Sequence, residues 1–140
     1  MTRNSILTDT SFWVALGDVK DKYRDQALRF AKSNRQQRII PDVALTEVTH
    51  LLHRHVGYHA VLIFLKAFSI SDVQLEPVTM NDVRHATEIM EQYADAKLDF
   101  VDCCIMALAE RLDINQICTF DRRDFVIFRR ANGEPLELLP

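Results

Sequence analysis

Short apolar runs along this chain alternate with longer segments in which apolar residues recur every three or four positions. The short runs are typical of buried strands and lie at residues 5–8, 38–41, 73–78 and 116–120. The longer segments each place their apolar residues on one face of a helix and lie at residues 12–16, 22–35, 43–55, 58–69, 83–93 and 99–112. Strands that alternate with helices predict an α/β fold in which helices flank a mainly parallel central sheet on both sides.

The C-terminal segment shows a different pattern. Residues 126–128 and 136–138 are two apolar runs on either side of Asn132 and Gly133, a dipeptide that favours hairpin turns. We therefore expect a β-hairpin that adds an antiparallel edge to the sheet. Earlier in the chain, Asp42 is expected to cap the helix at residues 43–55.

Length and composition narrow the class of protein. A chain of 140 residues with 48% hydrophobic residues suits one domain, spanning residues 1–140, with a substantial core. A net charge of −3 argues against a protein that coats nucleic acid, but it leaves room for a nuclease whose acidic site binds cations. Three cysteines, two of them adjacent, do not suggest disulfides. The N-terminus lacks the apolar core of a signal peptide, and no apolar run is long enough to span a membrane, so we expect a cytoplasmic protein.

Four acidic residues stand where a parallel sheet would bring them together. Asp9 and Asp121 follow predicted strands, Asp102 lies at the start of a predicted helix, and Glu47 lies beside the apolar face of another. The carboxyl ends of parallel strands meet at one edge of a sheet, where ligands bind. Carboxylate oxygens are the ligands that Mg²⁺ prefers, and a bound cation would offset their mutual repulsion.

Each of these acids also has a purely structural interpretation. Asp9, Asp99 and Asp102 suit helix caps or first turns, and Asp121 and Asp124 suit turns. From spacing alone, both interpretations remain open.

Basic residues near these acids also have two interpretations. Four arginines follow Asp121 closely, and they either belong to a solvated turn and hairpin or bind RNA phosphates: Arg122, Arg123, Arg129 and Arg130. Four histidines cluster between residues 50 and 59, but they do not share one helix face and no cysteine accompanies them at zinc-finger spacing. A solvated helix face explains them better than a zinc site.

Several motifs together resemble a known family. The segments LTDTSFW, ALTEV, DFVDCCIMALAERL and TFDRRDF are similar to those of the PIN-domain ribonucleases, and within them to the VapC-type toxins of bacterial toxin–antitoxin systems. The resemblance covers essentially the whole chain. It implies a PIN-like three-layer α/β/α fold and Mg²⁺- or Mn²⁺-dependent endonucleolytic cleavage of RNA, in which a metal-activated water attacks the phosphodiester.

The resemblance also implies roles for individual residues and partners. Asp9, Glu47, Asp102 and Asp121 would form the catalytic acidic quartet, with Asp9, Asp102 and Asp121 as metal ligands. Other polar residues would support the quartet: Thr10, Ser11, Asp99, Thr119 and Asp124. The expected partners are an RNA substrate, a VapB-type antitoxin and a second copy of the chain in a homodimer. No association with a membrane is expected.

Two rival functions follow from the same residues. The first is a PIN-fold protein that binds RNA or a partner without cleaving; a complete quartet favours the enzyme over this rival. The second is a phosphohydrolase that forms an aspartyl phosphate on Asp9. That chemistry usually needs a second acid two residues later, where this chain has Ser11.

Overall fold

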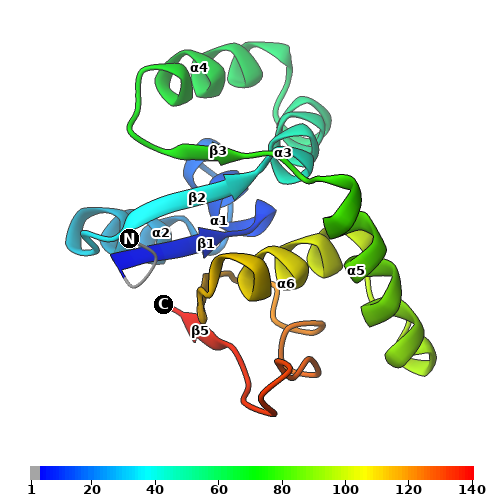
Figure 1. Cartoon of the computed structure of the whole chain (residues 1–140). Helices are drawn as coiled ribbons and strands as arrows, with labels where there is room; N and C mark the ends of the chain where they lie inside the picture. Colours follow the sequence, from blue (N-terminus) through cyan, green and yellow to red (C-terminus); the bar gives the residue numbers. More distant parts are fainter. Residues whose placement is uncertain (1–3) are drawn as a thin grey trace.

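The computed structural model describes residues 4–140 and has an all-parallel sheet of five strands in the order β3-β2-β1-β4-β5 (Figure 1). The elements follow one another along the chain as β1 (Ser5–Thr8), α1 (Thr10–Gly17), α2 (Arg24–Ser33), β2 (Gln37–Pro41), α3 (Asp42–His55), α4 (Tyr58–Ser69), β3 (Gln74–Glu76), α5 (Met80–Gln92), the 3₁₀ helix η2 (Ala94–Ala96), α6 (Phe100–Leu112), β4 (Gln116–Cys118) and β5 (Glu137–Leu139). The predicted α/β class is therefore confirmed.

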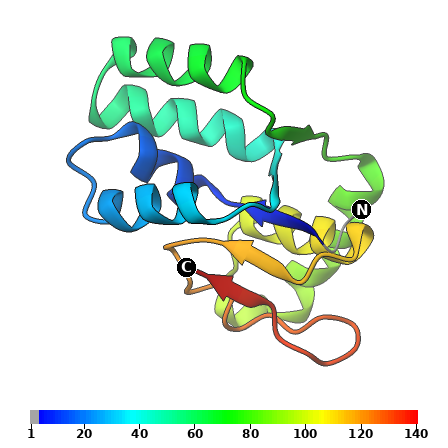
Figure 2. The same cartoon turned by 90° about the vertical axis from the view of Figure 1, so that its left-hand side faces the viewer.

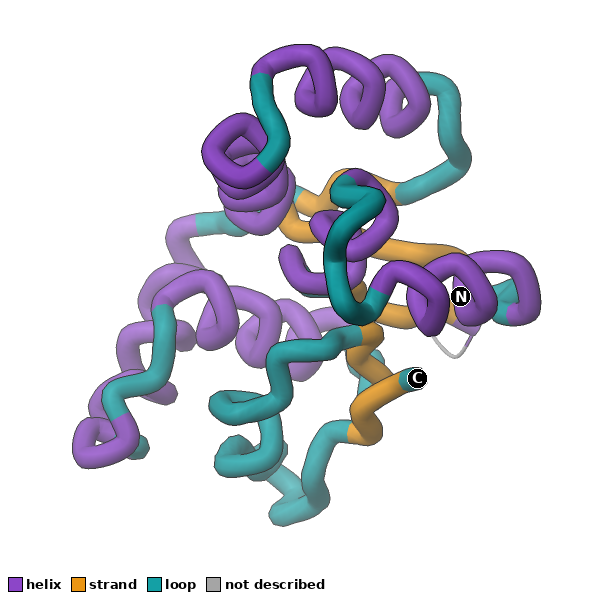
Figure 3. Tube along the Cα trace, turned by 180° about the vertical axis from the view of Figure 1, so that it is seen from behind, coloured by secondary structure: helices purple, strands orange, loops and turns teal. Residues whose placement is uncertain are grey.

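Helices cover both faces of the sheet and divide the core in two. Helices α5 and α6 pack together on one face, over Leu7, Ile39 and Ile117 of the strands (Figure 1). On the other face, seen from behind in Figure 3, helices α1 to α4 pack around Phe12 and Trp13. Because strand residues alternate between faces, the central strands must be apolar on both sides, which is why they read as continuous apolar runs.

The predicted C-terminal hairpin is wrong. Strand β5 pairs with β4 in parallel, and Figure 2 shows the two arrows side by side and pointing the same way. Phe125 and Phe128 instead lie in a turn region and are both buried in the core beneath α6. Their spacing of three residues suits one side of a helical turn rather than a strand. Asn132 and Gly133 do form a turn, with Gly133 at a φ of 86°, but it reverses an irregular loop that carries the chain back to the start of β5.

The expected helix cap at Asp42 is also wrong. Helix α3 begins at Asp42 itself, and the residue before it, Pro41, provides no side-chain cap. The Asp42 carboxylate instead accepts a hydrogen bond from the backbone N–H of Val78, which lies beyond the neighbouring strand β3. A tertiary contact has replaced the local one. Within the described residues, no helix combines the length and apolar character needed to cross a membrane.

Candidate active site

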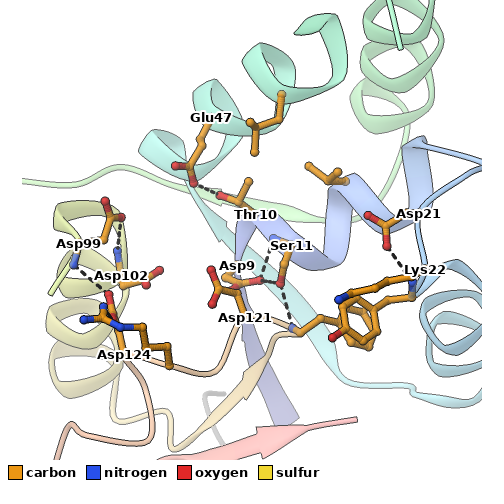
Figure 4. A pocket seen from close by; sticks show the side chains of 15 residues that line it. Asp9, Thr10, Ser11, Asp21, Lys22, Glu47, Asp99, Asp102, Asp121 and Asp124 are labelled. Atoms are coloured by element: carbon orange, nitrogen blue, oxygen red, sulfur yellow. Dashed lines mark hydrogen bonds and ion pairs between the residues drawn. The ribbon is translucent and has the colours of Figure 1, made fainter. Parts of the chain in front are cut away.

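A cavity of about 490 Å³ opens beyond the carboxyl ends of β1 and β4, and its walls are strongly acidic (Figure 4). Seven carboxylates line it: Asp9, Asp21, Glu47, Asp99, Asp102, Asp121 and Asp124. All four members of the predicted quartet are among them. They come from four separate parts of the chain, and the parallel sheet brings these parts to one edge.

Asp9 lies at the centre of this cavity (Figure 4) and is only 3% exposed. Strand β1 ends at Thr8, and the Asp9 N–H extends the pairing with β4 by donating to the carbonyl of Cys118. The Asp9 side chain caps α1 by accepting from the N–H groups of Ser11 and Phe12. Burial raises the pKa of Asp9 to about 6, although the hydrogen bonds oppose this shift.

Two hydroxyl groups fix the orientation of Asp9. Ser11 Oγ donates to one carboxylate oxygen over 2.6 Å, and Thr119 Oγ1 donates to the other over 2.5 Å. Each hydroxyl also accepts a backbone hydrogen bond from the loop after β4, Ser11 from Phe120 N at 2.8 Å and Thr119 from Asp121 N at 3.0 Å. The same two side chains therefore hold Asp9 and fasten the loop that carries Asp121.

Asp102 lies in the first turn of α6, half-buried against the same cavity. Its pKa rises to about 9, first because burial disfavours the charged form and then because the negative charge of Asp9 repels it. A hydrogen bond with Asp124 that favours the protonated form, and repulsion by Asp99 and Asp124, raise it further. An acid with this pKa keeps its proton at neutral pH unless a cation binds beside it.

Glu47 and Asp121 approach Asp9 from other sides. Glu47 is half-buried on α3, as the sequence predicted, and Thr10 Oγ1 donates to its Oε1 over 2.5 Å. Asp121 is exposed on the loop after β4, where its negative charge contributes to the raised pKa of Asp9. Thr10 therefore positions Glu47 in the way that Thr119 positions Asp9.

Asp99 and Asp124 have structural tasks at this edge. Asp99 caps α6 by accepting from the N–H groups of Val101 and Asp102, so the structural interpretation of its position is confirmed. Asp124 is buried, and its two oxygens accept from the Asp99 N–H and the Arg123 guanidinium. Asp124 thereby ties the loop after β4 to the start of α6, which sets the position of Asp102.

The chemistry of these donors fits a hard divalent cation. Several carboxylates converge in one cavity, and two of them have pKa values raised by burial and by like charge, the combination that a divalent cation relieves. Within residues 4–140, however, no three His, Cys, Asp or Glu side chains already stand in an arrangement that could hold a metal ion.

The structure separates the four arginines. Arg123 alone lines the acidic cavity, and its guanidinium is bound to Asp124 and to the carbonyl of Ala96. Arg122 donates to the carbonyl of the C-terminal Pro140. Arg129 and Arg130 line a different cavity, beside α5. Of the four arginines predicted to bind RNA, Arg123 is the one that lines this cavity.

The side chains opposite α6 were not predicted as part of the site. Figure 4 shows Asp21 and Lys22 across the cavity from Asp99, Asp102 and Asp124, and Tyr23 and Phe120 line the same region. The sequence pattern placed Tyr23 on a buried helix face and Phe120 in a strand. Because both are apolar, no pattern of polar residues could identify them.

The clustered histidines and the cysteines have no part in the cavity. All four histidines between residues 50 and 59 are exposed on α3 and α4, as predicted. The three cysteines are free and buried. Burial raises the pKa of Cys103 to about 12 and that of Cys104 to about 11, so both thiols remain neutral and unreactive.

Comparison with known proteins is consistent with this geometry. A sequence model of the PIN domain family matches residues 6–133. The chain is 23% identical to ribonuclease VapC26 of Mycobacterium tuberculosis, over 96% of this chain and 100% of that protein. It is 28% identical to the 23S rRNA-specific endonuclease VapC20 of the same organism, over 83% of this chain and 88% of that protein.

Solved structures show the same fold. The crystal structure of VapC20, described as a sarcin–ricin loop cleaving toxin, superposes with a TM-score of 0.78 at 27% identity, covering 84% of this chain and 90% of that one. A toxin–antitoxin complex from Klebsiella pneumoniae gives a TM-score of 0.66 at 19% identity, covering 86% of this chain and 89% of that one.

Proposed function

The chain belongs to the PIN domain family, and on this premise we propose that it is an endoribonuclease that hydrolyses RNA phosphodiester bonds with a divalent cation, Mg²⁺ or Mn²⁺. The observation that carries this proposal is the convergence of Asp9, Glu47, Asp102 and Asp121 on one cavity at the edge of the parallel sheet. The similarity to a ribonuclease and to an rRNA endonuclease supports the same reaction.

Asp9, Asp102 and Asp121 would hold the cation, and Glu47 would complete the acidic set. When bound, a divalent cation supplies charge that activates water for attack and stabilises the negative charge of the transition state. Ser11 and Thr119 keep both oxygens of Asp9 in fixed positions, so little reorganisation of Asp9 is needed when the substrate arrives. Thr10 holds Glu47 in the same way. Within residues 4–140 the second Glu47 oxygen accepts no hydrogen bond, so it would orient water or a ligand.

We further propose that the protein is the toxin of a type II toxin–antitoxin pair. The curated relatives are VapC proteins, and the Klebsiella pneumoniae complex that shares the fold is described as a toxin–antitoxin complex; together they support a VapB-type antitoxin as partner. Helix α4 offers a surface for such a partner or for a second copy of the chain, because it exposes Tyr58 (65%), Leu62 (39%) and Ile63 (57%). The homodimer remains a prediction.

The test is cleavage of ribosomal RNA, and of a hairpin with the sarcin–ricin loop sequence, by purified protein with Mg²⁺, Mn²⁺ or EDTA. The second substrate is chosen because VapC20 is described as cleaving that loop. We expect metal-dependent cleavage that falls about 100-fold or more in Asp9→Asn and Asp102→Asn. The matched control is Asp95→Asn, an exposed carboxylate on η2 outside the cavity, which should cleave as the native protein does.

A second readout separates the enzyme from a protein that only binds. Mn²⁺ affinity, measured by titration calorimetry, should fall in Asp9→Asn and stay unchanged in Asp95→Asn. Native protein that binds Mn²⁺ and RNA but leaves every substrate intact would favour the non-catalytic alternative. Cleavage that persists in EDTA would contradict the proposed role of the metal.

A further inference from the structure

Two aromatic rings stack face to face beside the acidic cavity. Tyr23 and Phe120 have ring centroids 4.7 Å apart and an interplanar angle of 8°. Tyr23 immediately precedes α2, whereas Phe120 comes from the loop after β4, and both side chains line the cavity and are only partly buried. The rings that Phe12 and Trp13 contribute to the core on this side of the sheet meet their neighbours edge to face. The stacked pair packs against this core and also forms part of the cavity wall.

Lys22 supplies a positive charge at the same rim. Its Nζ lies 5.1 Å from the centroid of the Tyr23 ring, and its side chain is exposed. Within the described residues, Lys22 and Arg123 are the cations that line this cavity, and the Arg123 guanidinium is already bound to Asp124 and to a carbonyl. Among the described residues Lys22 forms no ion pair. A phosphate that bound its ammonium group would displace no carboxylate and would compete only with its contact to the Tyr23 ring.

The position of these three residues suits a polynucleotide that crosses the acidic centre. Lys22 lies across the cavity from Asp102 and Asp124, with Asp9 and Asp121 between them (Figure 4). A phosphodiester held near Asp9 would thus carry a neighbouring nucleotide toward Lys22 and the stacked pair. Aromatic side chains bind bases by stacking on their faces, and this requires a base that is not already stacked in a duplex.

We propose that Lys22, Tyr23 and Phe120 form a subsite for an unpaired nucleotide next to the scissile phosphate. The base stacks on the Tyr23–Phe120 pair, and the Lys22 ammonium contacts a flanking phosphate. This subsite rests on the proposed nuclease function and makes single-stranded or loop RNA the preferred substrate over duplex RNA. The three residues bind and position the substrate; the acidic residues remain responsible for hydrolysis.

The binding test uses a single-stranded 12-nucleotide RNA with one internal 2-aminopurine, and the same RNA in a duplex, in EDTA at low ionic strength. Fluorescence of 2-aminopurine falls when the base stacks. We expect native protein to bind the single strand more tightly and to quench its fluorescence. Tyr23→Leu and Phe120→Leu should weaken binding about tenfold and abolish the quench, while Tyr23→Trp should retain both. The matched control is Ile70→Ala, which removes an exposed apolar side chain outside this cavity and should change neither the affinity nor the quench.

Lys22→Gln is a second test that does not depend on packing, because this side chain is exposed. It should weaken single-strand binding several-fold and reduce the slope of log K against log salt by about 0.7. Lys20→Gln, which removes an exposed lysine that does not line the cavity, should change neither. The subsite is overturned if Lys22→Gln and a folded Tyr23→Leu bind the single strand as tightly as the native protein does, or if the native protein does not prefer the single strand.

Kinetics separate this proposal from the nuclease function. With Mg²⁺ and a cleavable RNA, the subsite variants should raise KM about tenfold with little change in kcat, whereas Asp102→Asn should lower kcat. If Tyr23→Leu and Lys22→Gln cleave RNA in a metal-dependent way with an unchanged KM, the proposed subsite is refuted and the proposed nuclease function stands. If the native protein binds RNA with quenching, these variants lose that binding, and no condition gives cleavage, the subsite is supported and the proposed nuclease function is refuted.

Discussion

The Asp102→Asn substitution should make the metal-free protein more stable while it inactivates the site. The position of Asp102 destabilises the folded protein, since burial and the nearby carboxylates raise its pKa from 3.8 to about 9. In the folded protein the group holds its proton over a pH range in which the unfolded chain has already released it. The folded state therefore binds more protons than the unfolded state between these two pKa values, and its stability falls as the pH rises through that range.

The size of this effect follows from the shift. Each pH unit above 3.8 costs about 1.4 kcal/mol, so the upper bound at pH 8 is about 6 kcal/mol. The recoverable part is smaller, because water reaches the half-buried side chain, because its titration is coupled to that of Asp9, and because the asparagine amide needs hydrogen-bond partners of its own. We expect the free energy of unfolding to rise by about 1–3 kcal/mol at pH 8 and the gain to shrink toward zero near pH 5.

Urea denaturation in EDTA at pH 5, 6.5 and 8 measures this difference directly. Asp95→Asn serves as the matched control, because its carboxylate is exposed and should show no gain. Adding Mn²⁺ should stabilise the native protein more than Asp102→Asn, because the cation relieves the same repulsion. A variant that is no more stable than the native protein at pH 8, or whose gain does not depend on pH, would refute the electrostatic reasoning.

Three further predictions concern the packing and the hydrogen bonds. Thr119→Val removes the hydroxyl that donates to Asp9, so it should lower the free energy of unfolding by about 1–2 kcal/mol and also slow RNA cleavage. A variant that matches the native protein in both urea denaturation and RNA cleavage would contradict this prediction. Arg111→Gln removes both hydrogen bonds to the buried Asp82 and should cost about 1–3 kcal/mol, discounted because Arg111 is partly exposed. Burial opposes the shift, but Arg111 and Thr79 lower the pKa of Asp82. The stabilisation by this ion pair is therefore present above about pH 4 and is lost on further acidification. If Arg111→Gln unfolded in acid at the same pH as the native protein, the result would count against a stabilising pair. Leu52→Ala creates a cavity in the core and should cost about 2–4 kcal/mol by thermal or urea unfolding, while an unchanged midpoint would show that this core is not tightly packed.

Local signals account for most of what the sequence predicted. The helix α4 was predicted with its observed bounds, because apolar periodicity and the preceding Gly57 act within a few residues. Strands β1 and β2 and helix α6 were also predicted to within a residue or two, because buried parallel strands and amphipathic helices leave direct patterns. The carboxylate quartet could be proposed because parallel strands bring their carboxyl ends to one edge.

Only the tertiary structure decided how the rest of the chain is used. The direction of β5 depends on the burial of Phe125 and Phe128 beneath α6, a contact that a local turn signal at Asn132 and Gly133 cannot express. The use of Asp42 depends on Val78, which is far away in sequence.

The composition of the active-site rim was likewise beyond the sequence pattern. The four arginines lie at residues 122–130, shortly after Asp121, yet Arg129 and Arg130 line a different cavity. Tyr23 and Phe120 are 97 residues apart in the sequence and stack in the folded chain, where Ser11 accepts from the Phe120 N–H and Thr119 donates to Asp9. The sequence by itself determined most of the helices and strands and the acidic residues, since these depend on neighbouring positions and on the parallel sheet. Which side chains surround the acids depends on contacts between distant segments, and these exist only in the folded chain.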